Sequence, residues 1–149
     1  MLLENNATKN VELGVAYSDK YRSLSLPEFR TNNSLIDLYI TKILDFPNSP
    51  VKTFKASEGS ISFRVATGIA LNIPDGWVGE IFVNRQFALE QRTSLLSGVG
   101  FVASGATGEI KLTLQTSDRD CYLAEGDLIA HLVLRPLSVM TKSEFTFNF

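Results

Sequence analysis

The chain contains a single cysteine, Cys121, and a single histidine, His131, and these are the first residues to consider for chemistry. A thiol and an imidazole can form a nucleophile and its base, but a lone cysteine before a short apolar run is more typical of a structural residue. Zinc sites draw several ligands from Cys and His, so one of each leaves too few. His131 lies inside the apolar run Leu128–Leu134, which favours a hydrogen-bonded structural histidine over a ligand or a base.

The segment Gly100–Ile110 (GFVASGATGEI) has a turn signal at Ser104-Gly105 but carries little chemistry. Ala103 and Ala106 flank that turn, and a methyl group cannot accept a proton. The segment therefore offers no general base before Glu109.

Strand patterns dominate the elements that would position these residues. Ile61, Phe63 and Val65 alternate with polar residues, as do Ile110, Leu112 and Leu114, and Leu128–Leu134 reads as a strand that is buried on both faces. Many short strands separated by turn residues predict an all-β barrel or jelly roll.

Two segments depart from this pattern. Gln86–Ser97 mixes leucines and Phe87 among polar residues before Gly98, which predicts one short helix. The end of the chain alternates Phe145, Phe147 and Phe149 with polar residues, which predicts a strand that needs a partner in this chain or in a neighbouring subunit.

The composition bounds the class of protein. A chain of 149 residues with 44% hydrophobic and 20% charged residues suits one globular domain. A net charge of −2 gives no basic surface for nucleic acid, and no apolar stretch is long enough to span a bilayer. We therefore expect no nucleic-acid partner, no membrane association and no secretory leader.

Four stretches resemble motifs of the trimeric dUTPase family, and the likeness runs from about Val11 to Leu137. They are Leu26-Pro27 followed by Ser34–Tyr39 (SLIDLY), Thr67–Ile81 (TGIALNIPDGWVGEI), Gly100–Ile110 (GFVASGATGEI) and Gly126–Leu132 (GDLIAHL). The resemblance implies an all-β, jelly-roll-like barrel of β-clip type with one short helix, assembled as a homotrimer. It also implies a loose arm over residues 1–10, the domain over 11–137 and a strand-like tail over 138–149.

The resemblance places Asp37, Arg85, Gln86, Gly100 and His131 around the family's nucleotide pocket. Asp37 would help to hold the magnesium–phosphate complex, and Arg85 would meet a phosphate, make an intersubunit ion pair or face solvent. Gln86 stands in place of a phosphate-binding serine, and His131 stands in place of a glutamine.

Other parts of the family's machinery are missing from the sequence. Ala103 replaces the water-activating aspartate and Ala106 replaces the sugar-stacking tyrosine, while residues 138–149 lack the glycine and arginine of the closing tail. Loss of a general base typically costs ~10²–10⁴ in rate. The related dCTP-deaminase chemistry lacks its glutamate, which is Thr113 here. This pattern predicts no catalytic residue, no metal and no cofactor.

The main hypothesis from the sequence is therefore a catalytically inactive dUTPase-like trimer that is a structural or binding module and not an enzyme. Its most concrete form is a capsid decoration protein of a phage or virus, located on the virion or in the host cytoplasm. Its partners would be further copies and other virion proteins, with Phe145, Phe147 and Phe149 at those contacts. Two alternatives stay open: a divergent dUTP or dNTP pyrophosphatase that uses Asp37, Glu109 or Asp127 with Mg²⁺, and a regulator that binds a nucleotide or a host protein.

Overall fold

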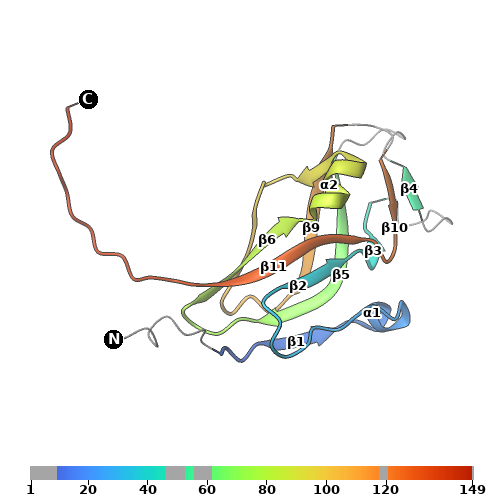
Figure 1. Cartoon of the computed structure of the whole chain (residues 1–149), viewed down its shortest axis with the longest axis horizontal. Coiled ribbons are helices and arrows are strands. Elements are labelled where there is room, and N and C mark those ends of the chain that lie inside the picture. Colours follow the sequence, from blue (N-terminus) through green and yellow to red (C-terminus); the bar gives the residue numbers. More distant parts are fainter. Residues whose placement is uncertain (1–9, 46–52, 56–61, 118–120, 149) are drawn as a thin grey trace.

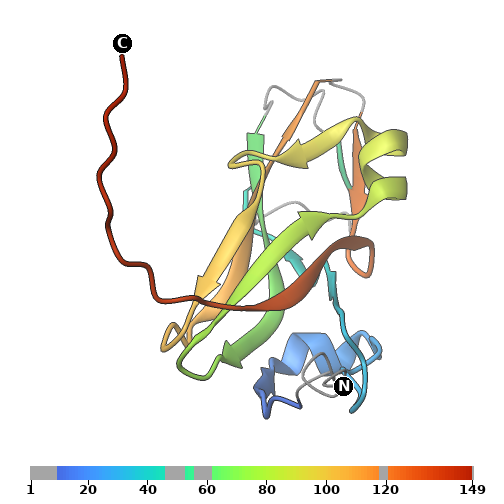
Figure 2. The ribbon, with the colours of Figure 1, turned by 60° about the vertical axis from the view of Figure 1, so that its left-hand side comes forward.

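The alternating strands form two antiparallel sheets that enclose one shared core (Figures 1 and 2). The computed structural model describes residues 10–45, 53–55, 62–117 and 121–148. Its strands are β1 Gly14–Tyr17, β2 Ile36–Tyr39, β3 Lys42–Ile43, β4 Thr53–Lys55, β5 Ser62–Asn72, β6 Trp77–Val83, β7 Thr93–Leu95, β8 Gly100–Ala103, β9 Glu109–Thr116, β10 Tyr122–Ala124 and β11 Leu128–Pro136. Two short helices, α1 Asp19–Ser23 and α2 Arg85–Gln91, accompany them. These features confirm the predicted all-β class.

One sheet has the strand order β1-β5-β9-β7, with β3 also paired to β5, and the other has the order β2-β11-β6-β8. A two-stranded ribbon joins β10 to β4. The predicted alternation is clear in β9, where Ile110, Leu112 and Leu114 are buried and the residues between them are not. Burying one face of each sheet removes a large apolar area from water and drives the two layers together.

The second sheet carries the candidate site, and β11 is one of its two central strands. Ile129, Ala130 and Leu132 of β11 are fully buried, whereas His131 keeps part of its side chain at the surface. β11 pairs with β2 on one side and β6 on the other, which sets His131 opposite Asp37 and Phe82. The expected strand at Leu128–Leu134 is therefore confirmed, but its predicted burial on both faces is wrong, because His131, Val133 and Leu134 are only partly buried.

Two turns that look from the sequence like hairpin connections instead join the two sheets. The resemblance treats Thr67–Ile81 as a strand pair, but β5 and β6 lie in different sheets. The segment Gly100–Ile110 behaves in the same way, because β8 pairs with β6 and β9 pairs with β5 and β7. Each of these strands has one apolar face. Because the chain passes from one sheet to the other at each turn, the apolar faces of the two connected strands meet in the core between the sheets.

The helix predicted over Gln86–Ser97 is correct only in its first half. Asn84 caps α2, which ends at Gln91, and Arg92 then adopts a left-handed backbone (φ 49°). Beyond it β7 pairs with β9, which buries Leu95 in the core and satisfies the backbone in the sheet. The sequence also gave no signal for α1, a five-residue helix that Ser18 caps.

The tail does not form a strand within this chain, so the predicted strand with a partner in a neighbouring subunit stays a prediction. Residues 137–148 form no helix or strand, and they extend away from the domain in both views (Figures 1 and 2). Phe145 and Phe147 touch each other edge to face, with ring centroids 6.5 Å apart, and both are exposed. A single extended segment needs a neighbouring strand to satisfy its backbone, and none of the described strands runs beside it. Phe149 and residues 1–9 of the expected N-terminal arm lie outside the described residues.

Candidate functional site

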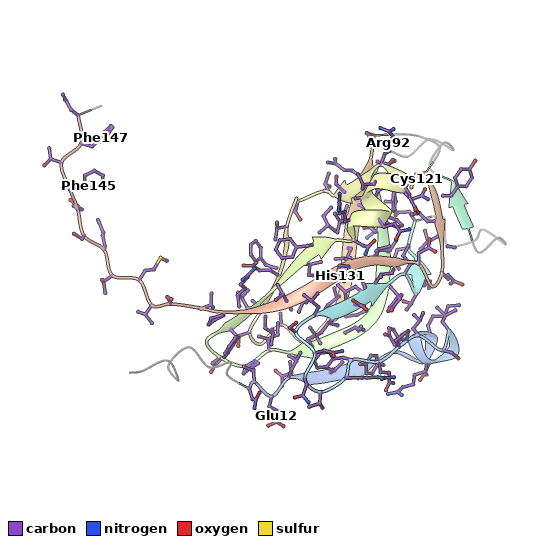
Figure 3. All side chains as sticks on the ribbon, viewed as in Figure 1. Glu12, Arg92, Cys121, His131, Phe145 and Phe147 are labelled. Carbon is purple, nitrogen blue, oxygen red and sulfur yellow. The ribbon has the colours of Figure 1, made fainter. Side chains whose placement is uncertain are left out.

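Three side chains form a continuous hydrogen-bonded chain on the outer face of the second sheet. His131 stands opposite Asp37 across the β11–β2 pair, and its Nδ1 lies 2.9 Å from Asp37 Oδ1. On its other side, His131 Nε2 lies 2.9 Å from Nδ2 of Asn84. Figure 3 shows His131 on β11 where that strand runs beside β2. We call Asp37, His131 and Asn84 the relay.

The relay continues into the first turn of α2. Oδ1 of Asn84 accepts a hydrogen bond of 2.9 Å from the backbone N–H of Phe87, the usual contact of a helix N-cap. The buried ring of Phe87 anchors the same turn in the core. Arg85 is the first residue of α2. The hydrogen bond from Phe87 to Asn84 and the burial of Phe87 therefore fix the position of the Arg85 backbone.

Asp37 and Arg85 bring opposite charges to this part of the surface. The Asp37 side chain is half exposed, and only its Oδ1 is engaged by another described residue. Arg85 is exposed, and its guanidinium has no ion-pair partner among the residues that the structure describes. Burial, and to a lesser degree the Asp37 carboxylate, raises the pKa of Tyr39 on β2, so its hydroxyl stays protonated.

The other carboxylates that the sequence offered for catalysis are used in the fold. Oε2 of Glu109 accepts a 2.9 Å hydrogen bond from the backbone N–H of Gly68. Oδ2 of Asp127 accepts one of 2.9 Å from the N–H of Ala124 in the turn before β11, a turn role that fits its place after Gly126. Of the three candidates, Asp37 is the one that no backbone group occupies.

The remaining predicted positions lie elsewhere. Gln86 donates to Glu90 one turn along α2 (2.9 Å), so it lies on the helix surface. Gly100 is on β8 opposite Ile81, where a Cβ atom would come within 3.2 Å of the Ile81 side chain. Gly100, Ala103 and Ala106 line an open cavity of about 740 Å³ between β8, β7 and β9.

The relay and the turn that follows Ala103 lie far apart within one chain. Ala103 pairs with Val78 at the start of β6, whereas Asn84 follows the end of β6. Six residues of strand at ~3.3 Å each separate the two ends by about 20 Å. The structure therefore gathers Asp37, Arg85 and His131 at one end of the sheet and leaves the Ala103 turn at the other.

Sequence reasoning missed Asn84. The available signal was an asparagine directly before a helical pattern, which is a favourable N-cap residue. Its second contact, with His131, joins positions 47 residues apart in sequence and depends on the pairing of β6 with β11.

Comparison with known proteins gives relatives that are named as dUTPases. No family model matches the chain. A deoxyuridine 5'-triphosphate nucleotidohydrolase of Tropheryma whipplei (strain Twist) is 36% identical over 75 residues, which cover 49% of this chain and 51% of that protein. One from Ehrlichia canis is 28% identical over 117 residues, covering 77% of this chain and 71% of that protein. These relatives support the predicted resemblance to the dUTPase family. It spans about half the length of the curated relatives that it matches first.

Solved structures of the family share the fold. A mutant dUTPase of Staphylococcus bacteriophage 80alpha superimposes with a TM-score of 0.68 at 15% identity, covering 94% of this chain and all of that one. Another mutant of the same protein, solved with the dUTP analogue dUpNHpp, gives a TM-score of 0.66 at 13% identity, covering 93% and 90%. A phage or viral origin for this chain, and its location on a virion or in the host cytoplasm, stay predictions.

These comparisons contradict two predictions from the sequence. The relatives are named as hydrolases and the structural neighbours are dUTPases, one of them with a dUTP analogue bound, so the inactive capsid-decoration protein is wrong as the main hypothesis. The prediction that the chain is not an enzyme is wrong for the same reason. The prediction rested on the missing family residues at Ala103, Ala106 and the tail, whereas the structure leaves one carboxylate oxygen of Asp37 unengaged by the described residues.

The prediction of no metal stays a prediction, and a structural neighbour bears on it. A mutant dUTPase of phage phi11 of S. aureus, with a TM-score of 0.64 at 16% identity over 91% of this chain and 97% of that one, coordinates a structural Mg(II) ion. In the described part of this chain, no three His, Cys, Asp or Glu side chains gather to hold a metal ion. Mg²⁺ usually keeps several waters and binds one or two carboxylates together with substrate phosphates. Asp37 fits that mode of binding, in which the nucleotide supplies most of the ligands. None of the described helices is long and apolar enough to cross a membrane.

Proposed function

We propose that this chain is a divergent deoxynucleoside triphosphate pyrophosphatase, with dUTP as the first substrate to test. The observation that carries the proposal is the half-exposed carboxylate of Asp37, which His131 holds through one oxygen while the other stays available. Arg85 enters the same region as a cation with no partner among the described residues. The resemblance to the dUTPase family and the dUTPase names of the relatives support this reaction over others.

The reaction requires a water molecule to attack a phosphorus atom of the triphosphate. A bond forms between the water oxygen and the α-phosphorus, the bond from that phosphorus to the bridging oxygen breaks, and pyrophosphate leaves with the bonding electron pair. The free oxygen of Asp37 accepts the proton that the water loses. Arg85 offsets the negative charge that develops on the phosphate chain. Bound Mg²⁺ would neutralise part of the same charge.

The proposal is tested by measuring pyrophosphate release from dUTP, dCTP and dTTP in the presence of Mg²⁺, with purified full-length chain. We expect turnover of dUTP within the ordinary range of enzymes, about 1–10³ s⁻¹. Arg85→Ala should reduce turnover about tenfold or more, since a charge-assisted contact to phosphate is lost. Absence of release from all three nucleotides would contradict the proposed function.

A second part of the proposal is that several copies assemble. The relay end and the Ala103 turn lie about 20 Å apart along β6 at ~3.3 Å per residue, so one nucleotide in contact with both would need the turn of a neighbouring copy.

Exposed apolar side chains also favour assembly. The domain exposes Phe82 and Phe101 on the second sheet, and the tail exposes Val139, Met140 and Phe145. Apolar groups exposed together in this way mark contact surfaces. The family resemblance favours a homotrimer with sites between subunits, which agrees with the general preference for closed symmetry.

Light scattering tests this assembly. We expect a mass of about three 16.5-kDa chains. Removal of residues 138–149 should lower the mass, because the exposed aromatic side chains of the tail would no longer have a neighbour to bind. Lys142→Ser, which changes an exposed tail residue that is paired only with Glu144, is the control and should leave the mass unchanged. A single-chain mass for the intact protein would refute the assembly.

A further inference from the structure

The hydrogen bonds of the relay assign the position of the proton on His131. Oδ1 of Asn84 accepts from the N–H of Phe87, so the other end of that amide, its NH₂ group, faces the imidazole. An NH₂ group only donates, and Nε2 of His131 must therefore accept with a lone pair. The ring hydrogen then lies on Nδ1, which donates to the Asp37 carboxylate. Every polar atom of the relay has one consistent role.

Asn84 links two elements of the fold through the two ends of its amide. Its Oδ1 accepts a hydrogen bond from the first turn of α2, and its Nδ2 donates to the imidazole of His131 on β11 over 2.9 Å. The start of α2 and the outer face of β11 are therefore joined by one side chain.

We propose that Asn84 and His131 are positioning residues. Their hydrogen bonds join Asp37 to the start of α2 and so fix the distance between Asp37 and Arg85, which contact the phosphate chain of the substrate. For the roles of Asp37 and Arg85, the inference rests on the proposed function. Asp37 is oriented through one oxygen, which leaves the other directed to substrate. Arg85 follows Asn84 directly in the chain, so a displaced cap displaces the base of its side chain. Errors of about 1 Å in such positioning can cost ~10² in rate.

The side chains around the relay leave few other partners for the imidazole. Phe82 lies opposite His131 on β6 and is apolar. Two residues farther along the strands, Glu80 is paired with Arg135 (3.1 Å). Among the described residues, the hydrogen bonds of the His131 ring are therefore those to Asp37 and Asn84.

Two substitutions at position 131 separate positioning from packing. In His131→Gln, the amide NH₂ can donate to Asp37 and the amide oxygen can accept from Asn84, so both hydrogen bonds survive. In His131→Leu, neither survives, while a side chain of similar bulk stays on the sheet. We expect kcat/KM for dUTP within about threefold of the wild type for the glutamine variant. For the leucine variant we expect a fall of about tenfold or more, with unchanged oligomer mass.

A third substitution separates the relay from the helix cap. Serine is also a good N-cap residue, so Asn84→Ser keeps the hydrogen bond to Phe87 but cannot reach His131 with a donor amide. The start of α2 should stay helical while kcat/KM falls as in His131→Leu. If Asn84→Ser has wild-type kcat/KM, the link to His131 has no positioning role and the proposal is wrong.

A readout that needs no nucleotide keeps this inference distinct from the proposed function. The chain has one histidine, so long-range ¹H–¹⁵N spectra report on His131 without ambiguity. We expect the hydrogen on Nδ1 in both the wild type and Asn84→Ser, because Asp37 still accepts from Nδ1, and we expect the ¹⁵N shift of Nε2 to change in Asn84→Ser because Nε2 loses the hydrogen bond from Asn84. The backbone order parameter of Arg85 should be near ~0.85 in the wild type and His131→Gln, and should fall toward ~0.6 in His131→Leu.

Pyrophosphate release tests the proposed function, whereas the spectra of His131 and the order parameter of Arg85 test the relay, so either can be contradicted without the other. If the wild type releases no pyrophosphate and does not bind dUpNHpp, the proposed function is wrong, and the relay is then judged on the spectra and on the order of Arg85. A wild-type His131 with its hydrogen on Nε2, or an Arg85 that is equally ordered in all variants, would overturn the relay whatever the activity.

Discussion

Replacing Asp37 with asparagine should reduce turnover of dUTP by ~10²–10⁴, because the amide cannot take the proton that the attacking water loses. The side-chain oxygen of asparagine can still accept the hydrogen bond from Nδ1 of His131, so the relay and the strand pairing survive. Steady-state pyrophosphate release gives the turnover, and thermal unfolding shows whether the fold is intact. We expect the unfolding midpoint of Asp37→Asn to stay close to that of the wild type.

A matched control for Asp37→Asn removes the same charge at a distance. Glu12 is exposed and lies well away from His131 (Figure 3). Glu12→Gln should therefore retain wild-type turnover. If Asp37→Asn kept more than about a tenth of the activity, Asp37 could not be the proton acceptor, since loss of a general base costs more than that.

Replacing Gly68 with alanine should give the largest loss of stability among the single methyl additions. Gly68 has φ +70°, and an added Cβ would lie 2.7 Å from Oγ of Ser18 and 2.9 Å from Cγ2 of Thr41. Strain at such a backbone costs about 1–3 kcal/mol, and overpacking adds roughly another 1–3 kcal/mol. Denaturant unfolding should show the combined loss in the free energy of unfolding.

Gly105→Ala is the matched control, because Gly105 has a similar φ of +83° but no atom within 4 Å of the added Cβ. It should lose only the contribution of backbone strain, so the difference between the two variants measures the packing contribution around Gly68. Equal losses in both variants would show that the contacts with Ser18 and Thr41 tolerate the methyl group. Gly68 also donates its N–H to Glu109, and this explains why that carboxylate serves the fold and not the reaction.

The strands could be predicted well because their signal is local. A sheet with one buried face imposes a period of two on the chain, and Ile110, Leu112 and Leu114 display that period in the sequence and in the burial. At the tail the same local rule shows that a segment can form a strand but not which partner it pairs with, and residues 143–148 form no strand within this chain.

Helix boundaries were less predictable because a tertiary contact decides where α2 ends. Leucines continue the helical pattern past Gln91. Burial of Leu95 beside β9 stabilises the chain more than a longer helix would, because most of a helix's stability comes from the packing of its apolar face. Arg92 accepts an uncommon left-handed backbone at that transition.

The sequence by itself determined the all-β class, through its alternating apolar positions, and the resemblance to the dUTPase family, through motifs such as Gly126–Leu132. It also identified Asp37, Arg85 and His131 as separate candidates. Only the tertiary structure decided that Asp37 and His131, 94 positions apart, are hydrogen-bonded, and that Asn84 joins them to the helix that begins with Arg85. The reason is physical: a hydrogen bond requires atoms within about 3 Å, and the register of β11 with β2 and β6, which no local pattern encodes, brings them there.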